Sequence, residues 1–297
     1  MKMNPNSIKE LRNRTGLGLS DCKRALEECN GDIESAIDKL RIIGIANADK
    51  KFDRVTLDGL IAMHLVGNYG ILVELNCETD FVARNEKFIN LISDLVLIAY
   101  QERCTSVSEL KNAKYKDVGT VQEAIINSAS ILGEKLELSK LCYLEANNGI
   151  VAGYVHGYTP SMGKIGALVE LQSSGDKSKL QEIGKQIAMH VVAMKPEVLS
   201  IDDLDQIKLS NERSMIEKQV KILNKSKEIL KKIVDGRMAK YYEEVVLLEQ
   251  KFVRDEKIKV SDFIRSNEPT VNSTIKLMKY KLLILGSRNL VNDCYNR

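Results

Sequence analysis

The chain has 297 residues, of which 44% are hydrophobic and 29% are charged. These proportions are typical of a folded globular protein and exclude both a disordered tail and a membrane-embedded chain. No apolar run approaches the roughly 20 residues that a membrane-spanning helix needs, and no signal-peptide pattern follows the first residues. We therefore expect a cytoplasmic protein of about two domains that has no membrane partner.

The net charge of +3 is distributed unevenly along the chain. Residues 271–297 carry a net charge of +4, which leaves −1 for residues 1–270. A protein that binds DNA or RNA without sequence preference needs a basic surface and usually stacking aromatic rings. This chain has no Trp and only 5% aromatic residues, so its composition argues against nucleic acid as a direct partner.

The six cysteines are scattered, and only three histidines accompany them. Their spacing contains no Cys-x-x-Cys pair and fits neither a zinc site nor a disulfide framework. We expect free thiols, no metal and no cofactor. The cysteines are Cys22, Cys29, Cys77, Cys104, Cys142 and Cys294.

A docking module of three short helices is predicted for residues 1–54. Each apolar stripe follows a side chain that can cap a helix: Ser7 for the first, Ser20 or Asp21 for the second, and Asp32 for the third. A unit of this size buries little core of its own, so it is suited to docking on a partner.

A duplicated core follows a polar linker at residues 49–53. Two strand patterns surround a turn rich in Asn and Gly, a helix follows them, and the same arrangement then returns. The predicted strands and helices are 57–66, 71–75 and 85–100 in the first copy, and 149–155, 166–171 and 177–194 in the second. We therefore assign residues 55–145 and 146–206 to two halves of a core with antiparallel sheets, and we expect a helix at 120–131 to bridge the two halves.

The remaining sequence is predicted to form a hairpin and a return to the core. Residues 207–250 are charged, with apolar residues three, four or seven apart, which is typical of two helices paired as an antiparallel coiled coil with its tip at 224–226. Residues 251–297 return to the core and end in a tail. We expect Pro269 to break any helix there, and residues 274–285 fit a strand or a helix. The fold class is α+β.

The two copies differ directly after their second strand. The copies align without gaps there, so that Asp80 and Asp176 occupy equivalent positions, which favours a role for both as helix N-caps. Phe81 has no aromatic counterpart in the second copy. A phenylalanine beside a cap is most often a core residue or a hydrophobic staple. A ring that the fold does not require is also a candidate partner contact, and both interpretations remain open.

Catalytic motifs find little support. Residues 157–164 resemble a phosphate-binding loop, but five residues separate the glycines, and Ile165 stands where a magnesium-binding hydroxyl is needed. We therefore expect no nucleotide site in this chain. His64 and His190 are interpreted as satisfied or surface histidines, whereas His156 ends a strand at an exposed turn, where a structural role and a partner contact are both open.

Several segments of the chain match one known family in its own order: 8–16, 21–26, 30–33, 67–70, 74–77, 79–83, 187–190, 195–196 and 236–238. The most specific is the Thr-Asp-Phe-Val-Ala run at 79–83, which follows two strands. On these segments the chain resembles the bacterial translation elongation factor Ts family over roughly residues 7–265. The sequence after about residue 264 departs from the expected C-terminal module of the family.

The resemblance implies a ubiquitin-associated-like N-terminal domain, a duplicated α+β core and a projecting helical hairpin. It implies a non-catalytic guanine-nucleotide exchange factor for elongation factor Tu that binds no nucleotide itself. In that role Asp80 approaches the magnesium end of the GTPase pocket and Phe81 enters an apolar site between two helices. The other implied contact residues are Thr79 and Val82 beside the ring, and Arg12, Leu19, Ser20, His156 and Gly157 as docking residues.

Two other functions remain as alternatives. A scaffold would bind the GTPase without changing the release of its nucleotide. An enzyme would need a pocket with an acid or base of perturbed pKa, and the sequence nominates no such pair. The oligomeric state also remains open, because one exchange factor per GTPase and a dimer of such heterodimers are both compatible with the sequence.

Overall fold

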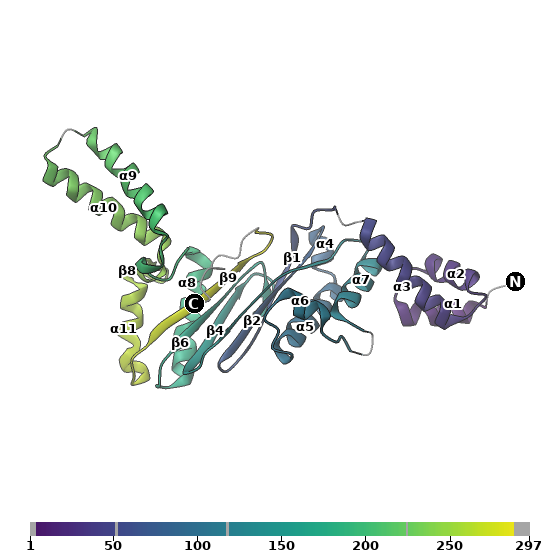
Figure 1. Ribbon diagram of the computed structural model, residues 1–297. Helices are drawn as coiled ribbons and strands as arrows, with labels where there is room; N and C mark the ends of the chain where they lie inside the picture. Colours follow the sequence, from purple (N-terminus) through teal and green to yellow (C-terminus); the bar gives the residue numbers. More distant parts are fainter. Residues whose placement is uncertain (1–3, 51–52, 117–118, 224, 288–297) are drawn as a thin grey trace. The chain divides into compact units, whose positions relative to one another are not determined.

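The computed structural model describes residues 4–50, 53–116, 119–223 and 225–287 (Figure 1). The chain forms two compact units, Met1–Ala62 with Val73–Cys142, and Met63–Leu72 with Tyr143–Arg297. Five of the six cysteines lie in the described ranges and are free thiols, whereas Cys294 lies outside them. In these ranges no helix combines the length and the apolar character needed to cross a bilayer.

The three predicted N-terminal helices are confirmed. They are α1 (Pro5–Thr15), α2 (Leu19–Glu28) and α3 (Ile33–Lys50). Their small shared core contains Leu11, Cys22, Ala25, Leu26, Ala36 and Leu40.

Two of the three predicted caps of these helices are wrong. Helix α1 begins earlier than Ser7, because Pro5 has the fixed φ of a first helical residue and the Asn4 side chain accepts a hydrogen bond from the Asn6 amide at 3.0 Å. Helix α2 follows Gly18 without a side-chain cap, so neither Ser20 nor Asp21 performs that role.

The cap of the third helix is confirmed, because the Asp32 carboxylate accepts from the Ser35 amide at 3.0 Å. The linker predicted at 49–53 is wrong at its start, since α3 continues to Lys50, and residues 51–52 lie outside the described ranges. Polar residues such as Lys and Asp interrupt an apolar pattern without ending a helix, especially when alanines lie between them.

The first half of the core has a sheet in the order β3-β2-β1-β5. The first half contributes β1 (Asp58–Val66), β2 (Tyr69–Cys77) and β3 (Glu137–Glu145) to this sheet, and the short β5 (Met162–Gly163) comes from residues of the second half. Its helices are α4 (Asp80–Ala83), α5 (Glu86–Gln101), α6 (Val107–Asn112) and α7 (Val121–Leu132). Helix α7 packs on α3, α5 and α6 within the first unit, so the prediction that it bridges the two halves is wrong.

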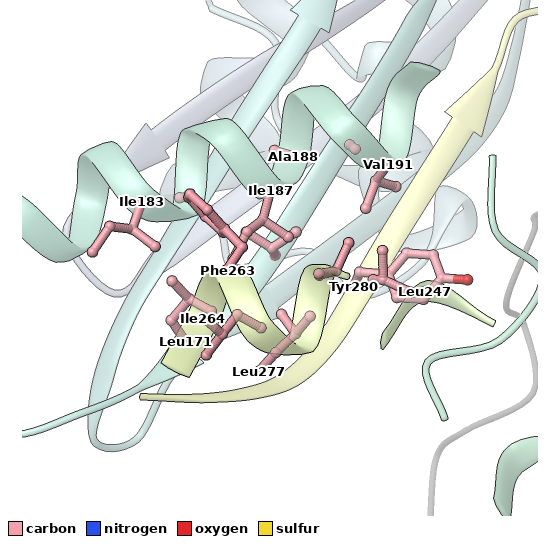
Figure 2. Close-up of a cluster of buried hydrophobic side chains, with 14 of the residues drawn as sticks. Leu171, Ile183, Ile187, Ala188, Val191, Leu247, Phe263, Ile264, Leu277 and Tyr280 are labelled. Atoms are coloured by element: carbon pink, nitrogen blue, oxygen red, sulfur yellow. The ribbon is translucent and has the colours of Figure 1, made fainter. Parts of the chain in front are cut away.

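The second half has an antiparallel sheet in the order β4-β6-β9, formed by β4 (Gly149–His156), β6 (Ile165–Gln172) and β9 (Lys276–Ile284). Helix α8 (Lys177–Met194) packs on β4, β6 and α11 (Val260–Val271). Figure 2 shows the buried cluster that these elements share, with Leu171, Ile183, Ile187, Val191, Phe263, Ile264, Leu277 and Tyr280.

The prediction that Pro269 breaks any helix is wrong, since Pro269 lies inside α11. A proline removes one backbone donor and clashes with the preceding turn. Here little helix follows the proline, because α11 ends at Val271 and Asn272 adopts the left-handed conformation with a φ of 56°. Burial of Val271 in the second core holds this last turn in place.

The ambiguous segment 274–285 is resolved as strand β9, and this extends the internal repeat. In the first half α7 leads into β3 beside β2, and in the second half α11 leads into β9 beside β6. The corresponding sheet orders are β3-β2-β1 and β9-β6-β4. The duplication therefore includes a third strand that the sequence comparison did not detect.

The predicted helical hairpin is confirmed as α9 (Gln206–Lys221) and α10 (Lys227–Val245), which lie side by side (Figure 1). Its core consists of Ile216, Val220, Val234 and Met238. The tip was predicted at 224–226, of which residue 224 lies outside the described ranges. Short elements flank the hairpin: η1 (Ile201–Asp203), η2 (Leu247–Glu249), β7 (Lys251–Phe252) and β8 (Asp255–Lys259).

His190 is a satisfied core histidine, as predicted. It is fully buried on α8, its Nε2 lies 3.0 Å from Gln250 Oε1, and its Nδ1 accepts from the Val253 amide at 3.1 Å. This arrangement fits a neutral imidazole, because protonated Nδ1 would face another donor. Burial lowers the pKa of His190 below its ordinary value, and the hydrogen bond to Gln250 opposes this shift.

The buried His190 predicts a loss of stability in mild acid. Above about pH 6.5 the imidazole is neutral in both states, whereas at lower pH the unfolded chain binds a proton that the folded chain resists. The free energy of unfolding should fall with a slope of up to about 1.4 kcal/mol per pH unit from this residue. Urea unfolding at pH 7.5 and 5.5 measures the slope, which His190→Gln should reduce. An equal slope in both proteins would contradict this assignment.

Candidate partner-binding turn

The Phe81 turn, residues 78–84, joins β2 to α5 and contains the single-turn helix α4. Thr79 has extended backbone angles and its hydroxyl accepts from the Val82 amide at 3.5 Å, so Thr79 is the N-cap. The prediction that Asp80 caps this helix is therefore wrong. The equivalent Asp176 does cap α8, where its carboxylate accepts from the amides of residues 178 and 179.

The Asp80 carboxylate is free of the capping role because Thr79 performs it one residue earlier. Asp80 instead forms an ion pair with Arg84 on the next turn, at 3.2 Å, and both side chains are substantially exposed. Exposed pairs of this kind contribute little stability. The carboxylate is therefore available to a partner at a small cost in folding energy.

The Phe81 ring is 83% exposed, whereas the next residue, Val82, is only 9% exposed. These values exclude the interpretation of Phe81 as a core residue or a hydrophobic staple. Val82 and Ala83 fasten the short helix to the core and leave the ring in solvent. Phe81 therefore lies where a partner can reach it, whereas Val82, which was also predicted as a contact residue, supports the turn from inside.

Hydrogen bonds to Glu134 hold the turn in place. Glu134 follows α7 and its C-cap Gly133, which has a left-handed backbone conformation. The Glu134 carboxylate accepts from the Glu78 amide at 3.1 Å, the Thr79 amide at 3.0 Å and the Thr79 hydroxyl at 2.5 Å. Glu78 in turn accepts from the Lys135 amide at 2.7 Å. Sequence reasoning missed Glu134, and the glycine just before it was the only local signal.

The predicted docking residues of the N-terminal helices are all exposed. Arg12 lies in the last turn of α1, and Leu19 and Ser20 lie in the first turn of α2, on either side of the turn at 16–18. Leu19 is 58% exposed although it is a large aliphatic residue. Within the described part of the chain Arg12 forms no ion pair, whereas Arg14 on the same helix is paired with a glutamate.

His156 and Gly157 lie at the end of β4, as predicted. The exposed His156 ring has its Nδ1 3.1 Å from the Tyr154 hydroxyl. Gly157 has a φ of 136°, which favours glycine, and the carbonyl of His156 accepts from the Lys164 amide at 3.0 Å. Residues 157–164, which include the short β5, connect β4 to β6, and these two strands pair as a hairpin, so the predicted place of the segment between two strands of one hairpin is confirmed.

Comparison with known proteins identifies the family of the chain. A family model described as Elongation factor TS matches residues 78–281, more than half of the chain. Curated relatives named Elongation factor Ts cover nearly all of it. One from Wolbachia sp. subsp. Brugia malayi is 73% identical over 97% of this chain and 100% of its own length. One from Ehrlichia canis is 47% identical over 96% of this chain and 100% of its own length.

The chain belongs to the elongation factor Ts family. The family match begins at Glu78, in the first position of the Phe81 turn, and also includes His156 and Gly157. It extends into β9, which corrects the expectation that the sequence departs from the family after about residue 264. Membership makes this chain a translation elongation factor.

Stability effects of very different size are expected for two neighbours in the turn. Phe81→Ala should change the free energy of unfolding by less than about 0.5 kcal/mol, because the ring is already in solvent. Val82→Ala should cost about 2 kcal/mol, because it removes two buried methyl groups. Urea unfolding followed by circular dichroism measures both. A larger loss for Phe81→Ala than for Val82→Ala would show that the ring packs in the fold.

Proposed function

We propose that this chain is a guanine-nucleotide exchange factor for elongation factor Tu, acting during polypeptide elongation. The observation that carries the proposal is the exposed Phe81 ring on a turn that the protein holds in place with Glu134. Family membership supports the role in elongation. A large exposed ring on a fixed support suits insertion into an apolar recess of a partner.

The exchange mechanism follows from what each group of the turn can disturb. Phe81 enters an apolar site between helices of the GTPase, and the Asp80 carboxylate approaches the magnesium end of its nucleotide pocket. Bound GDP depends on the Mg²⁺ ion and on backbone donors around the phosphates, so displacement of either speeds release. A 100-fold acceleration requires about 2.7 kcal/mol of differential stabilisation of the release barrier.

Docking and exchange belong to different parts of the chain in this proposal. Binding that is equal for all states of the GTPase shifts no equilibrium. Asp80 and Phe81, with Thr79 and Val82 as their support, therefore act on the nucleotide site. The remaining contact residues hold the exchange factor in position on the GTPase. They are Arg12, Leu19, Ser20, His156 and Gly157.

The segments of the chain have corresponding roles. Residues 1–54 serve as a ubiquitin-associated-like docking domain, and the 207–250 hairpin serves as an antiparallel coiled coil that helps to hold position. The two core halves, 55–145 and 146–206, present the Phe81 turn and the contact residues His156 and Gly157. Residues 251–297 return the chain to the core after the hairpin and end in a tail.

The protein performs no bond chemistry of its own in this role and needs neither a bound nucleotide nor a cofactor. Linkage requires that the exchange factor weaken the binding of GDP to the GTPase by a certain factor, and that GDP weaken the binding of the exchange factor by the same factor. It therefore binds the nucleotide-free GTPase best and leaves when GTP enters. The proposal places this cycle in the cytoplasm, with one exchange factor per GTPase or a dimer of such pairs.

Phe81→Ala should reduce the acceleration of GDP release by about tenfold or more, because the ring contributes only when it enters the partner. The measurement is the release of a fluorescent GDP analogue from the cognate elongation factor Tu at saturating exchange factor. Leu97→Ala on α5, which trims a different large apolar side chain that is partly exposed, is the matched control.

The same assay separates the alternatives. Wild-type protein that binds the GTPase without accelerating release would replace the exchange proposal by a scaffold. Acceleration that survives Phe81→Ala would keep the function but remove Phe81 from it.

Arg12→Ala should weaken docking without slowing exchange at saturation. Removing an exposed charge that forms no ion pair with the described residues is expected to raise the Kd for the GTPase by about fivefold and to reduce the salt dependence of association. Titration of the exchange rate against protein concentration gives the apparent Kd and the saturating rate separately. A lower saturating rate with unchanged Kd would assign Arg12 to the exchange step.

A further inference from the structure

We propose that Glu134 is a positioning residue for exchange, which fixes the Phe81 turn in the pose that enters the partner. The inference rests on the exchange function proposed above. Glu134 does not touch the ring and acts only through the backbone and the hydroxyl that precede it.

One carboxylate of Glu134 satisfies three donors at the start of the turn. Its Oε2 accepts from the amides of Glu78 and Thr79, and its Oε1 accepts from the Thr79 hydroxyl. Hydrogen bonds to an ionised acceptor are shorter and stronger than neutral ones. Loss of the carboxylate would leave two backbone amides of a partly buried segment without their partner.

The Thr79 hydroxyl transmits this constraint to the helix that carries the ring. Its proton is directed to Glu134, so that its lone pairs are available to the Val82 amide, which donates to it at 3.5 Å. The contact to Glu134 therefore orients the cap of α4. Phe81 lies in the sequence between Thr79 and Val82, the two residues that this capping hydrogen bond joins. The direction of the Phe81 side chain therefore depends on the cap.

The second copy of the repeat shows that the fold itself does not require a carboxylate at this place. There the residue after the left-handed Asn272 is Ser273, whose hydroxyl lies 2.9 Å from that of Ser174. The Asp176 amide donates to the Val271 carbonyl at 3.1 Å. The second copy thus joins these segments without a carboxylate at the place of Glu134, and the Lys179 ammonium, which donates to the Thr270 carbonyl at 3.1 Å, adds to the contact. Among these described residues, only the copy that presents Phe81 has a carboxylate at that place.

Loss of the hydrogen bonds that fix the Phe81 turn should lower the rate of nucleotide exchange more than the affinity for the GTPase. The docking residues lie on other segments, so the complex still forms, but the ring enters the partner less often in a productive pose. Small misplacements of an acting group cost rate even when binding persists. We expect Glu134→Ala to lower the saturating rate of GDP release about tenfold, with a change in Kd below about threefold.

The test compares Glu134→Ala and Glu134→Gln with Glu109→Ala in the full-length protein. Glu109 is the matched control, because its carboxylate also accepts from a threonine amide and hydroxyl, those of Thr105, at the start of α6. Glu134→Gln keeps one carbonyl acceptor without the charge and should fall between Glu134→Ala and wild type. Amide hydrogen exchange of residues 78 and 79 should accelerate in Glu134→Ala and remain slow in Glu109→Ala.

The outcomes separate this inference from the proposed function. Wild-type protein that fails to accelerate GDP release overturns both. The proposed function stands if the wild type accelerates GDP release and Phe81→Ala does not. If Glu134→Ala then has the wild-type saturating rate, that result overturns the positioning role of Glu134 alone. Unchanged hydrogen exchange at residues 78 and 79 in that variant also overturns it. A loss of rate equal in Glu134→Ala and Glu109→Ala would show a general loss of structure instead.

Discussion

Burial of the sheet faces under helices fixes where the strands of this protein end, and the candidate contact residues lie at those ends. In the second half, α8 and α11 contribute to one apolar cluster with β4, β6 and β9. In the first half, β2 is buried along its whole length and stops where the Phe81 turn begins. The positions of Phe81 and His156 are therefore consequences of sheet packing.

The two halves use one arrangement of elements for turns of different character. In the second half an aspartate caps a long helix directly, and the chain continues without interruption through α8. In the first half Thr79 caps a helix of only four residues, and a second helix then begins at Glu86. This interruption exposes one large ring that would otherwise lie on a continuous helix. Divergence after duplication thus affected the turn while the strands stayed comparable.

The sequence correctly predicted the helices and strands in which apolar residues recur at a regular spacing. The helix expected at 177–194 has these bounds in the structure, and the N-terminal helices and the hairpin are also confirmed. Helix starts were predicted less well, because several polar residues near a start can act as caps, and the structure selects among them. Asn4 replaces Ser7 in this way, and Thr79 replaces Asp80.

Features that depend on distant contacts had little sequence signal. Glu134 lies 55 residues after Thr79, and no spacing rule links a carboxylate to a backbone amide at that distance. Pro269 was expected to end a helix, but tertiary burial of α11 outweighs the lost backbone donor. Exposure of Phe81 was likewise not determined by the pattern, since apolar residues in such turns are usually buried.

The pairing of β6 with β9 also bears on how the chain folds during synthesis. These strands are neighbours in the sheet, yet more than 100 residues separate them, including the whole hairpin. Strand β6 therefore leaves the ribosome with one edge unpaired until β9 is synthesised, whereas the edge of β2 is unpaired only until β3 is synthesised. Pairing across such a separation has a high loop-closure cost and is slow. The second sheet is thus the late-folding part of the chain, and its open edge is the part most exposed to wrong pairing before translation ends.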